Sequence, residues 1–98
     1  MSAIDVRCDG GRAGGWTCAV TLGEGDPDGS SHRVRVSATE LERFAPGSAD
    51  PARLVEASFA FLLERESPQS ILRSFQLSEI GRYFPEYETE IRRRMSEA

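Results

Sequence analysis

The stretch WTCAVTL, residues 16–22, alternates apolar side chains with threonine and alanine. Alternation with a period of two is typical of a strand in a sheet that is covered on one side. The same pattern occurs at residues 4–8 and, with valine and arginine alternating, at residues 32–36. The linking segments, DGGRAGG and GEGDPDGSS, consist largely of residues that favour turns. Residues 1–36 therefore predict an antiparallel meander of three strands.

The composition changes near residue 48, because eight of the nine glycines precede that point. Ser37-x-x-Glu40 fits a capping box, and Asp50-Pro51 combines an N-cap acid with proline at the first helical position. Further start signals follow at Ser67-Pro68, Ser78 and Pro85. Residues 37–98 are therefore predicted to be helical, with three to four helices.

These patterns predict one small α+β domain over residues 1–98, with the helices packed on one face of the three-stranded meander. Because no helix is expected between the strands, the pattern argues against a βαβ arrangement. The apolar side chains of residues 51–66 cover an arc of roughly 200°, wider than the usual stripe of a surface helix. We expect this helix to be the main element of the core.

The charge composition excludes several classes of function. The formal net charge is -4, which disfavours general binding to phosphate backbones. All 12 basic side chains are arginine. Without lysine, the chain has neither a Walker-type phosphate loop nor an amine for Schiff-base chemistry. We find no catalytic constellation, metal site or cofactor site, and we expect a protein that is not an enzyme.

The cysteine content and the N-terminal sequence predict the cellular compartment of the protein. The sequence shows neither a secretory signal at its start nor an apolar run long enough to span a bilayer. Two cysteines in a chain without an export signal are expected to be reduced thiols, and the predicted location is the cytoplasm. If the first two strands form a hairpin, Cys8 is expected opposite Trp16 and Cys18 opposite Val6, so that the thiols are diagonal neighbours.

A few residues remain as candidates for chemistry. The glycine-rich loop Gly10–Gly15 carries Arg12, a combination that suits an anion, but it leads into a strand and is interpreted as a hairpin connection. Cys8, Cys18 and His32 are three soft ligands without the C-x-x-C spacing of structural zinc sites. We interpret them as structural residues, with the cysteines packed as small hydrophobes.

The favoured function is binding of a protein partner or of a second copy of the chain. The wide apolar arc of the central helix and an aromatic cluster around Pro85 support it, because aromatic side chains dominate interface hot spots. The expected contact residues are Phe61, Tyr83, Phe84 and Tyr87.

The alternative is a small DNA-binding regulator. Residues 68–84 fit a layout similar to a helix-turn-helix, with one helix from Pro68 to Phe75, a turn, and a second helix from Ser78 to Phe84. Arg73, Ser78 and Arg82 would then contact DNA. Against it, Glu79 stands where a base-contacting residue is needed. The competing interpretation is that the apolar residues of this stretch complete the core.

Overall fold

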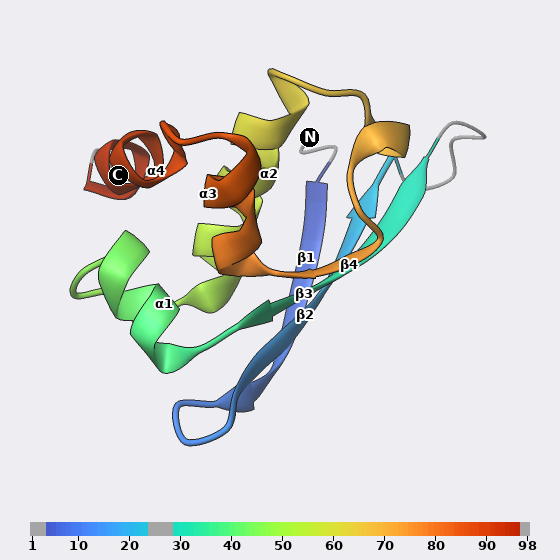
Figure 1. Ribbon diagram of the computed structural model, residues 1–98. Coiled ribbons are helices and arrows are strands. Elements are labelled where there is room, and N and C mark those ends of the chain that lie inside the picture. Colours follow the sequence, from blue (N-terminus) through green and yellow to red (C-terminus); the bar gives the residue numbers. More distant parts are fainter. Residues whose placement is uncertain (1–3, 24–28, 97–98) are drawn as a thin grey trace.

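A four-stranded sheet with four α-helices on one face is the framework of the protein (Figure 1). The computed structural model describes residues 4–23 and 29–96. The elements in chain order are β1 (Ile4–Gly11), β2 (Gly15–Leu22), β3 (Ser30–Val36), α1 (Ala38–Phe44), α2 (Pro51–Leu63), a 3-10 turn (Pro68–Ser70), β4 (Ser74–Gln76), a second 3-10 turn (Leu77–Glu79), α3 (Ile80–Tyr83) and α4 (Tyr87–Ser96). The predicted α+β class is confirmed.

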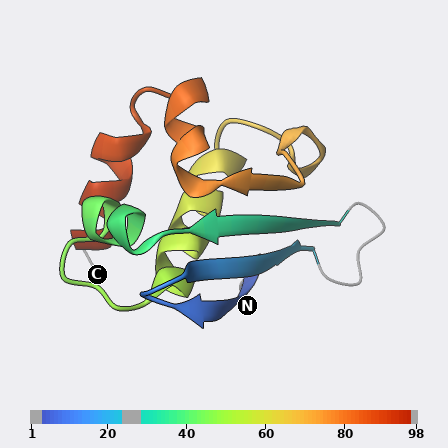
Figure 2. The ribbon, with the colours of Figure 1, turned by 60° about the horizontal axis from the view of Figure 1, so that its bottom comes forward.

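The meander is confirmed for β1, β2 and β3, but the sheet has a fourth strand. Figure 2 shows the strands side by side in the order β1-β2-β3-β4, with α2 behind them. Strand β4 pairs with β3 in parallel, so α1 and α2 form a crossover between two parallel neighbours. The predicted absence of a βαβ arrangement is therefore wrong, because a strand of three residues has no periodicity to detect.

The predicted register of the β1–β2 hairpin was wrong by two residues. Cys8 lies opposite Cys18, because pairing continues to Gly11 and Gly15 and leaves a three-residue loop. Gly15, the first residue of β2 after this loop, has a φ of 80°, in the left-handed region that favours glycine. The faces of both strands are nevertheless as expected, since a shift by two residues preserves them.

The core lies between the inner face of the sheet and α2. Most inward residues of β2 and β3 are buried, and so are five apolar side chains of α2, which confirms this helix as the central element. The inward residues of β1 are only half-buried. The buried α2 side chains other than proline and serine are Leu54, Val55, Phe59, Phe61 and Leu62.

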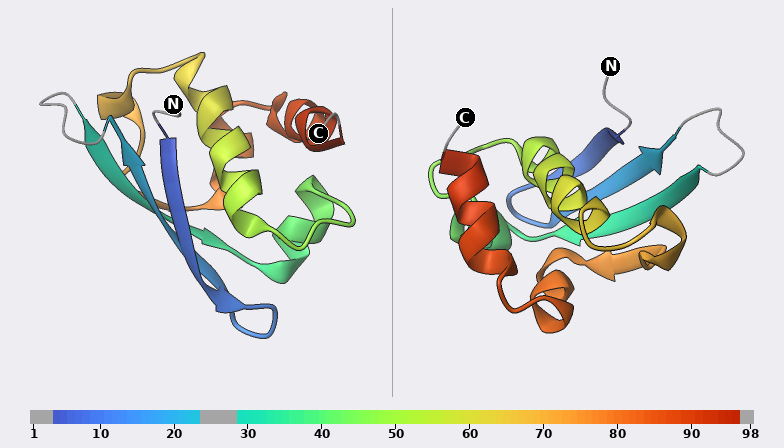
Figure 3. Two further views of the ribbon diagram at one scale, coloured as in Figure 1. Left: turned by 180° about the vertical axis from the view of Figure 1, so that it is seen from behind. Right: turned by 90° about the horizontal axis from the view of Figure 1, so that it is seen from above.

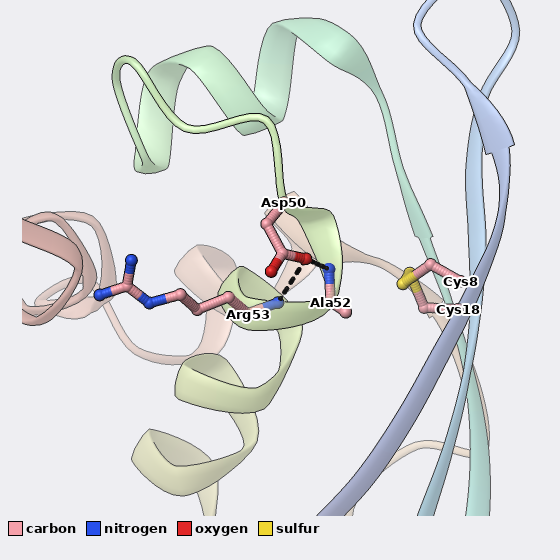
Figure 4. The surroundings of a disulfide bond; sticks show 5 residues. All are labelled: Cys8, Cys18, Asp50, Ala52 and Arg53. Carbon is pink, nitrogen blue, oxygen red and sulfur yellow. Dashed lines mark hydrogen bonds between the residues drawn. A yellow bond between two sulfur atoms is a disulfide. The ribbon is translucent and has the colours of Figure 1, made fainter. Parts of the chain in front are cut away.

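The predicted starts of α1 and α2 are confirmed by their caps. The Ser37 hydroxyl accepts from the Glu40 backbone N–H at 3.0 Å, while the Glu40 carboxylate accepts from the Ser37 N–H at 2.8 Å. At α2 the Asp50 carboxylate accepts from the backbone N–H groups of Ala52 and Arg53 at 3.1 and 3.3 Å (Figure 4). These caps satisfy helix N–H groups that have no partner inside the helix.

The helix predicted from Pro68 to Phe75 is wrong. Only residues 68–70 form a single 3-10 turn, and the chain then extends into β4. Strand β3 has a free edge after the meander, and the backbone N–H of Arg33 donates to the carbonyl of Arg73 at 2.7 Å. Pairing with β3 thus overrides a local helix signal. The segment after β4 is helical as predicted, although α3 has only four residues.

Candidate functional site

The two cysteines form a disulfide, which overturns the expectation of two reduced thiols. Cys8 and Cys18 are directly opposite on β1 and β2, with Cα atoms 4.0 Å apart. Figure 4 shows the sulfur atoms pointing from the strands toward the start of α2. The two-residue shift of the register explains the difference, because it turns predicted diagonal neighbours into a facing pair. The bond fastens the edge strand β1 to the sheet.

His32 holds the loop before β4 in place. Its side chain is buried on the inner face of β3, and Nδ1 lies 2.8 Å from the carbonyl oxygen of Leu72. Because a carbonyl only accepts, Nδ1 carries the proton and donates. The Ser30 hydroxyl lies 2.8 Å from Nε2 and completes the pair of hydrogen bonds. Both ring nitrogens are thus occupied by protein groups, as expected for a structural histidine.

Within the part of the chain that the structure describes, no three His, Cys, Asp or Glu side chains are grouped so that they could hold a metal ion. Residues Gly10–Gly15 form the ends and the tip of the β1–β2 hairpin. The hairpin interpretation of this loop is therefore confirmed. A Cβ at Gly10, where φ is 124°, would lie 2.3 Å from the carbonyl oxygen of Gly15, so this position requires glycine.

Two of the four expected contact residues are core side chains. Phe61 and Tyr87 are fully buried, with ring centroids 5.4 Å apart. The guanidinium of Arg65 covers the Phe61 ring at 3.7 Å. The Tyr87 hydroxyl lies 2.7 Å from the Ser58 hydroxyl, which itself donates to a carbonyl of α2, so Tyr87 is the donor. A partner cannot reach either aromatic ring without opening the core. The spacing of Tyr87 and Ile91, four residues apart on one face of a helix and both buried, is the signal that could have identified Tyr87 as a core residue.

The other two expected contact residues lie at a pocket. Tyr83 is 65% exposed and Phe84 is half-buried, and both line a pocket of about 150 Å³ beside β4. Leu72, which is 47% exposed, also lines it. Its remaining walls come from the end of α2, the segment that follows, β4 and α3; they include Leu62, Ile71, Phe75 and Ile80. The pocket is therefore apolar inside and has large apolar side chains on its rim.

Two acidic side chains, Glu66 and Glu79, also line this pocket. Both are half-buried, and Glu79 accepts a hydrogen bond from the backbone N–H of Gln76 at 2.8 Å. Leu72, Glu66 and Glu79 are not recognisable as a group from the sequence. Only the pairing of β4 with β3 brings the loop that carries Leu72 next to the end of α2.

The carboxylate of Glu40 holds the turn between β4 and α3, two elements that contribute residues to this pocket. It is buried, and it accepts hydrogen bonds from the Gln76 amide at 2.6 Å and from the Ser78 backbone N–H at 2.9 Å. These two contacts join the cap of α1 to the turn between β4 and α3. Burial by itself raises the pKa of Glu40, but the hydrogen bonds from Ser37, Ser78 and Gln76 outweigh it and hold the pKa below its usual value of 4.5.

The helix-turn-helix layout for residues 68–84 is wrong. Arg73 precedes a strand, Ser78 lies in a 3-10 turn, and Arg82 lies in the four-residue helix α3. Arg73 and Arg82 are exposed, while the backbone N–H of Ser78 is bound by Glu40. A recognition helix needs a longer run to lie in a major groove. The structure therefore does not place these three residues on one helix face.

Comparison of the chain with protein-family models, with curated proteins and with solved structures found no match. Among the residues described, no helix has both the length and the apolar character needed to cross a membrane.

Proposed function

We propose that this domain acts by binding a protein partner at the pocket beside β4. One observation carries the proposal. Leu72 and Tyr83, the two large hydrophobic side chains that are clearly exposed among the described residues, both line this same pocket. Single exposed hydrophobic residues are ordinary on protein surfaces, but two that flank one apolar depression favour a contact surface.

The lining of the pocket supports an expectation about the chemistry of the partner. Its floor is formed by aliphatic and aromatic side chains, which accept a large apolar side chain. Glu66 and Glu79 offer carboxylates at the same place. The partner segment is therefore expected to carry one or two large apolar residues next to an arginine or a lysine. The net charge of -4 favours the approach of such a basic segment.

Both sides of the pocket are fixed before a partner arrives. The hydrogen bond from His32 to the Leu72 carbonyl holds the loop that presents Leu72. The contacts of Glu40 with Gln76 and Ser78 hold the turn that leads to α3 and Tyr83. A preformed site loses little conformational entropy on binding, which favours affinity.

The test is selection of a random dodecapeptide library on the immobilised protein, followed by fluorescence anisotropy with the enriched peptides. We expect peptides with an apolar anchor beside a basic residue. The double variant Leu72→Ser/Tyr83→Ser is expected to weaken their binding at least tenfold, since truncated hot-spot residues commonly cost more than 1 kcal/mol. Both residues are exposed, so the variant should keep its circular dichroism spectrum.

The matched control is Thr17→Ser/Ala19→Ser, two exposed positions of β2 that face away from the helices. This control should bind the peptides like the unaltered protein. Equal binding of the peptides to the pocket variant, or enrichment of peptides without an apolar anchor, would show that the pocket is not the binding site.

A further inference from the structure

Strand β1 forms an open edge of the sheet. In the described part of the chain it pairs only with β2, and it is eight residues long (Figure 3, left). The Cα atoms of Cys8 and Cys18 are 4.0 Å apart, the close spacing of a non-hydrogen-bonded antiparallel pair. The backbone N–H and C=O groups of Cys8 therefore point away from β2. Because the pattern alternates, those of Val6 point outward as well.

This edge lacks two features with which proteins prevent edge-to-edge pairing, a proline and a bulge. Residues 4–11 contain no proline, and they pair with β2 residue by residue. The charged side chains of β1 stand on the solvent face of the sheet, so they do not obstruct the edge. An edge strand of this kind offers its backbone groups to another strand.

A groove of about 580 Å³ runs beside β1 on its inner face. Half-buried apolar side chains line it, and the flank of α2 that faces it has small residues, which permit the close approach of another chain. Two acidic and two basic side chains complete its rim, which suits contact with a surface of the same composition. The apolar lining residues are Ile4, Val6, Ala52, Ala57, Ala60 and Met95.

The order of charges along β1 favours a second copy of the same strand. Asp5, Arg7 and Asp9 all stand on the solvent face. Antiparallel pairing of two copies centred on Val6 sets Asp5 opposite Arg7 of the second copy, twice by symmetry. Centring on Arg7 would set arginine opposite arginine and Asp5 opposite Asp9. Opposite charges across strands stabilise a sheet, whereas like charges destabilise it.

Apolar contacts favour the register centred on Val6 over the third possible register, which is centred on Cys8. Pairing centred on Cys8 also matches charges, through Arg7 and Asp9, but it sets Val6 opposite Gly10. Pairing centred on Val6 instead packs Val6 on its own copy and Ile4 on Cys8. We propose that two copies of this chain form a symmetric dimer through antiparallel pairing of β1, centred on Val6, so that the two sheets become one of eight strands.

Arg7→Asp tests the pairing, because the side chain of Arg7 is exposed and its loss leaves the core intact. Sedimentation equilibrium of the unaltered protein should show a dimer, and R7D should raise the dissociation constant at least tenfold through two repulsive pairs. The double variant D5R/R7D restores opposite charges in the Val6 register and should restore the dimer. R7D/D9R restores them only in the Cys8 register and should not.

Amide hydrogen exchange supplies a second measurement. The N–H groups of Val6 and Cys8 should exchange more slowly as the protein concentration rises, and this dependence should vanish in R7D. Three results would overturn the proposal: a monomer at high concentration, a dimer that R7D leaves unchanged, or rescue by R7D/D9R in place of D5R/R7D. None of these results depends on the pocket beside β4, so the two proposals fail separately.

Discussion

The carboxylate of Glu40 connects parts of the chain that are nearly 40 residues apart in sequence, since it binds the amide of Gln76 and the backbone N–H of Ser78. It also completes the capping box of α1 through the N–H of Ser37. Three donors thus converge on one side chain that is only 8% exposed. Such an arrangement needs an acceptor with two oxygens, and only a carboxylate supplies it.

Glu40→Gln is therefore expected to lower the free energy of unfolding by about 1–3 kcal/mol at neutral pH. The glutamine NH₂ group cannot accept a hydrogen bond, so one of the buried donors would lose its acceptor. The folded-state pKa of Glu40 lies below 4.5, so its carboxylate stabilises the fold fully above that pH. This contribution is lost as the pH falls through the lower folded-state pKa. The difference between the two proteins should shrink accordingly.

Denaturant unfolding of both proteins at neutral pH and at pH values below 4.5 measures this difference. Glu42→Gln is the matched control, since Glu42 is exposed on the same helix and should change stability little. Equal stability of Glu40→Gln and the unaltered protein at neutral pH would contradict the role of Glu40, and so would a difference that persists in acid.

At the scale of elements, the strength of the local signal decided what the sequence could predict. The strands β1, β2 and β3 alternate over five residues or more, and α1 and α2 begin with strong caps, so all five were predicted. Strand β4 has three residues, and only its pairing with β3 makes it a strand. The pocket beside β4 was missed for the same reason.

The candidate contact residues also show how far the sequence predicts the exposure of a side chain. Tyr83 and Tyr87 are four residues apart in one aromatic cluster, yet Tyr83 is 65% exposed and Tyr87 is fully buried. Tyr87 begins α4 and packs against α2, where its hydroxyl donates a hydrogen bond to the Ser58 hydroxyl. Tyr83 ends α3, on the rim of the pocket. Tyr87 shares a helix face with Ile91, which is also buried, whereas the bend between α3 and α4 leaves the Tyr83 ring exposed.

The β1–β2 hairpin is the element whose stability should depend on oxidation. Its disulfide closes a loop with a sequence separation of 10. Reduction is therefore expected to lower the free energy of unfolding by about 2–3 kcal/mol, because the unfolded chain regains the freedom of that loop. Denaturant unfolding with and without dithiothreitol measures the change. The double variant Cys8→Ala/Cys18→Ala should show no response to dithiothreitol.

Thiol titration of the unfolded, unreduced protein checks the bond itself. We expect no reactive thiol before reduction and two afterwards. Two reactive thiols before reduction would show that the cysteines are reduced as the protein is isolated. The prediction of a cytoplasmic location stays a prediction, although disulfides persist mainly in oxidising compartments.

At the scale of the whole molecule, the two proposed surfaces lie at opposite edges of the sheet. The groove beside β1 and the pocket beside β4 are separated by β2 and β3, which corresponds to about 14 Å at the usual strand spacing. A dimer formed through β1 would leave both pockets open at the outer ends of an eight-stranded sheet. The outermost strands would then be about 34 Å apart. The dimer would thus be a bivalent binder.

A tandem peptide tests this arrangement: two copies of an enriched dodecapeptide joined by a glycine-serine linker of about 40 residues, whose average span is about 35 Å. We expect it to bind the unaltered protein at least tenfold more tightly than the single peptide, because the second binding event becomes intramolecular. R7D should bind the single peptide normally but lose the tandem advantage, and D5R/R7D should regain it. A tandem advantage of equal size in R7D would show that the two pockets are not linked through β1.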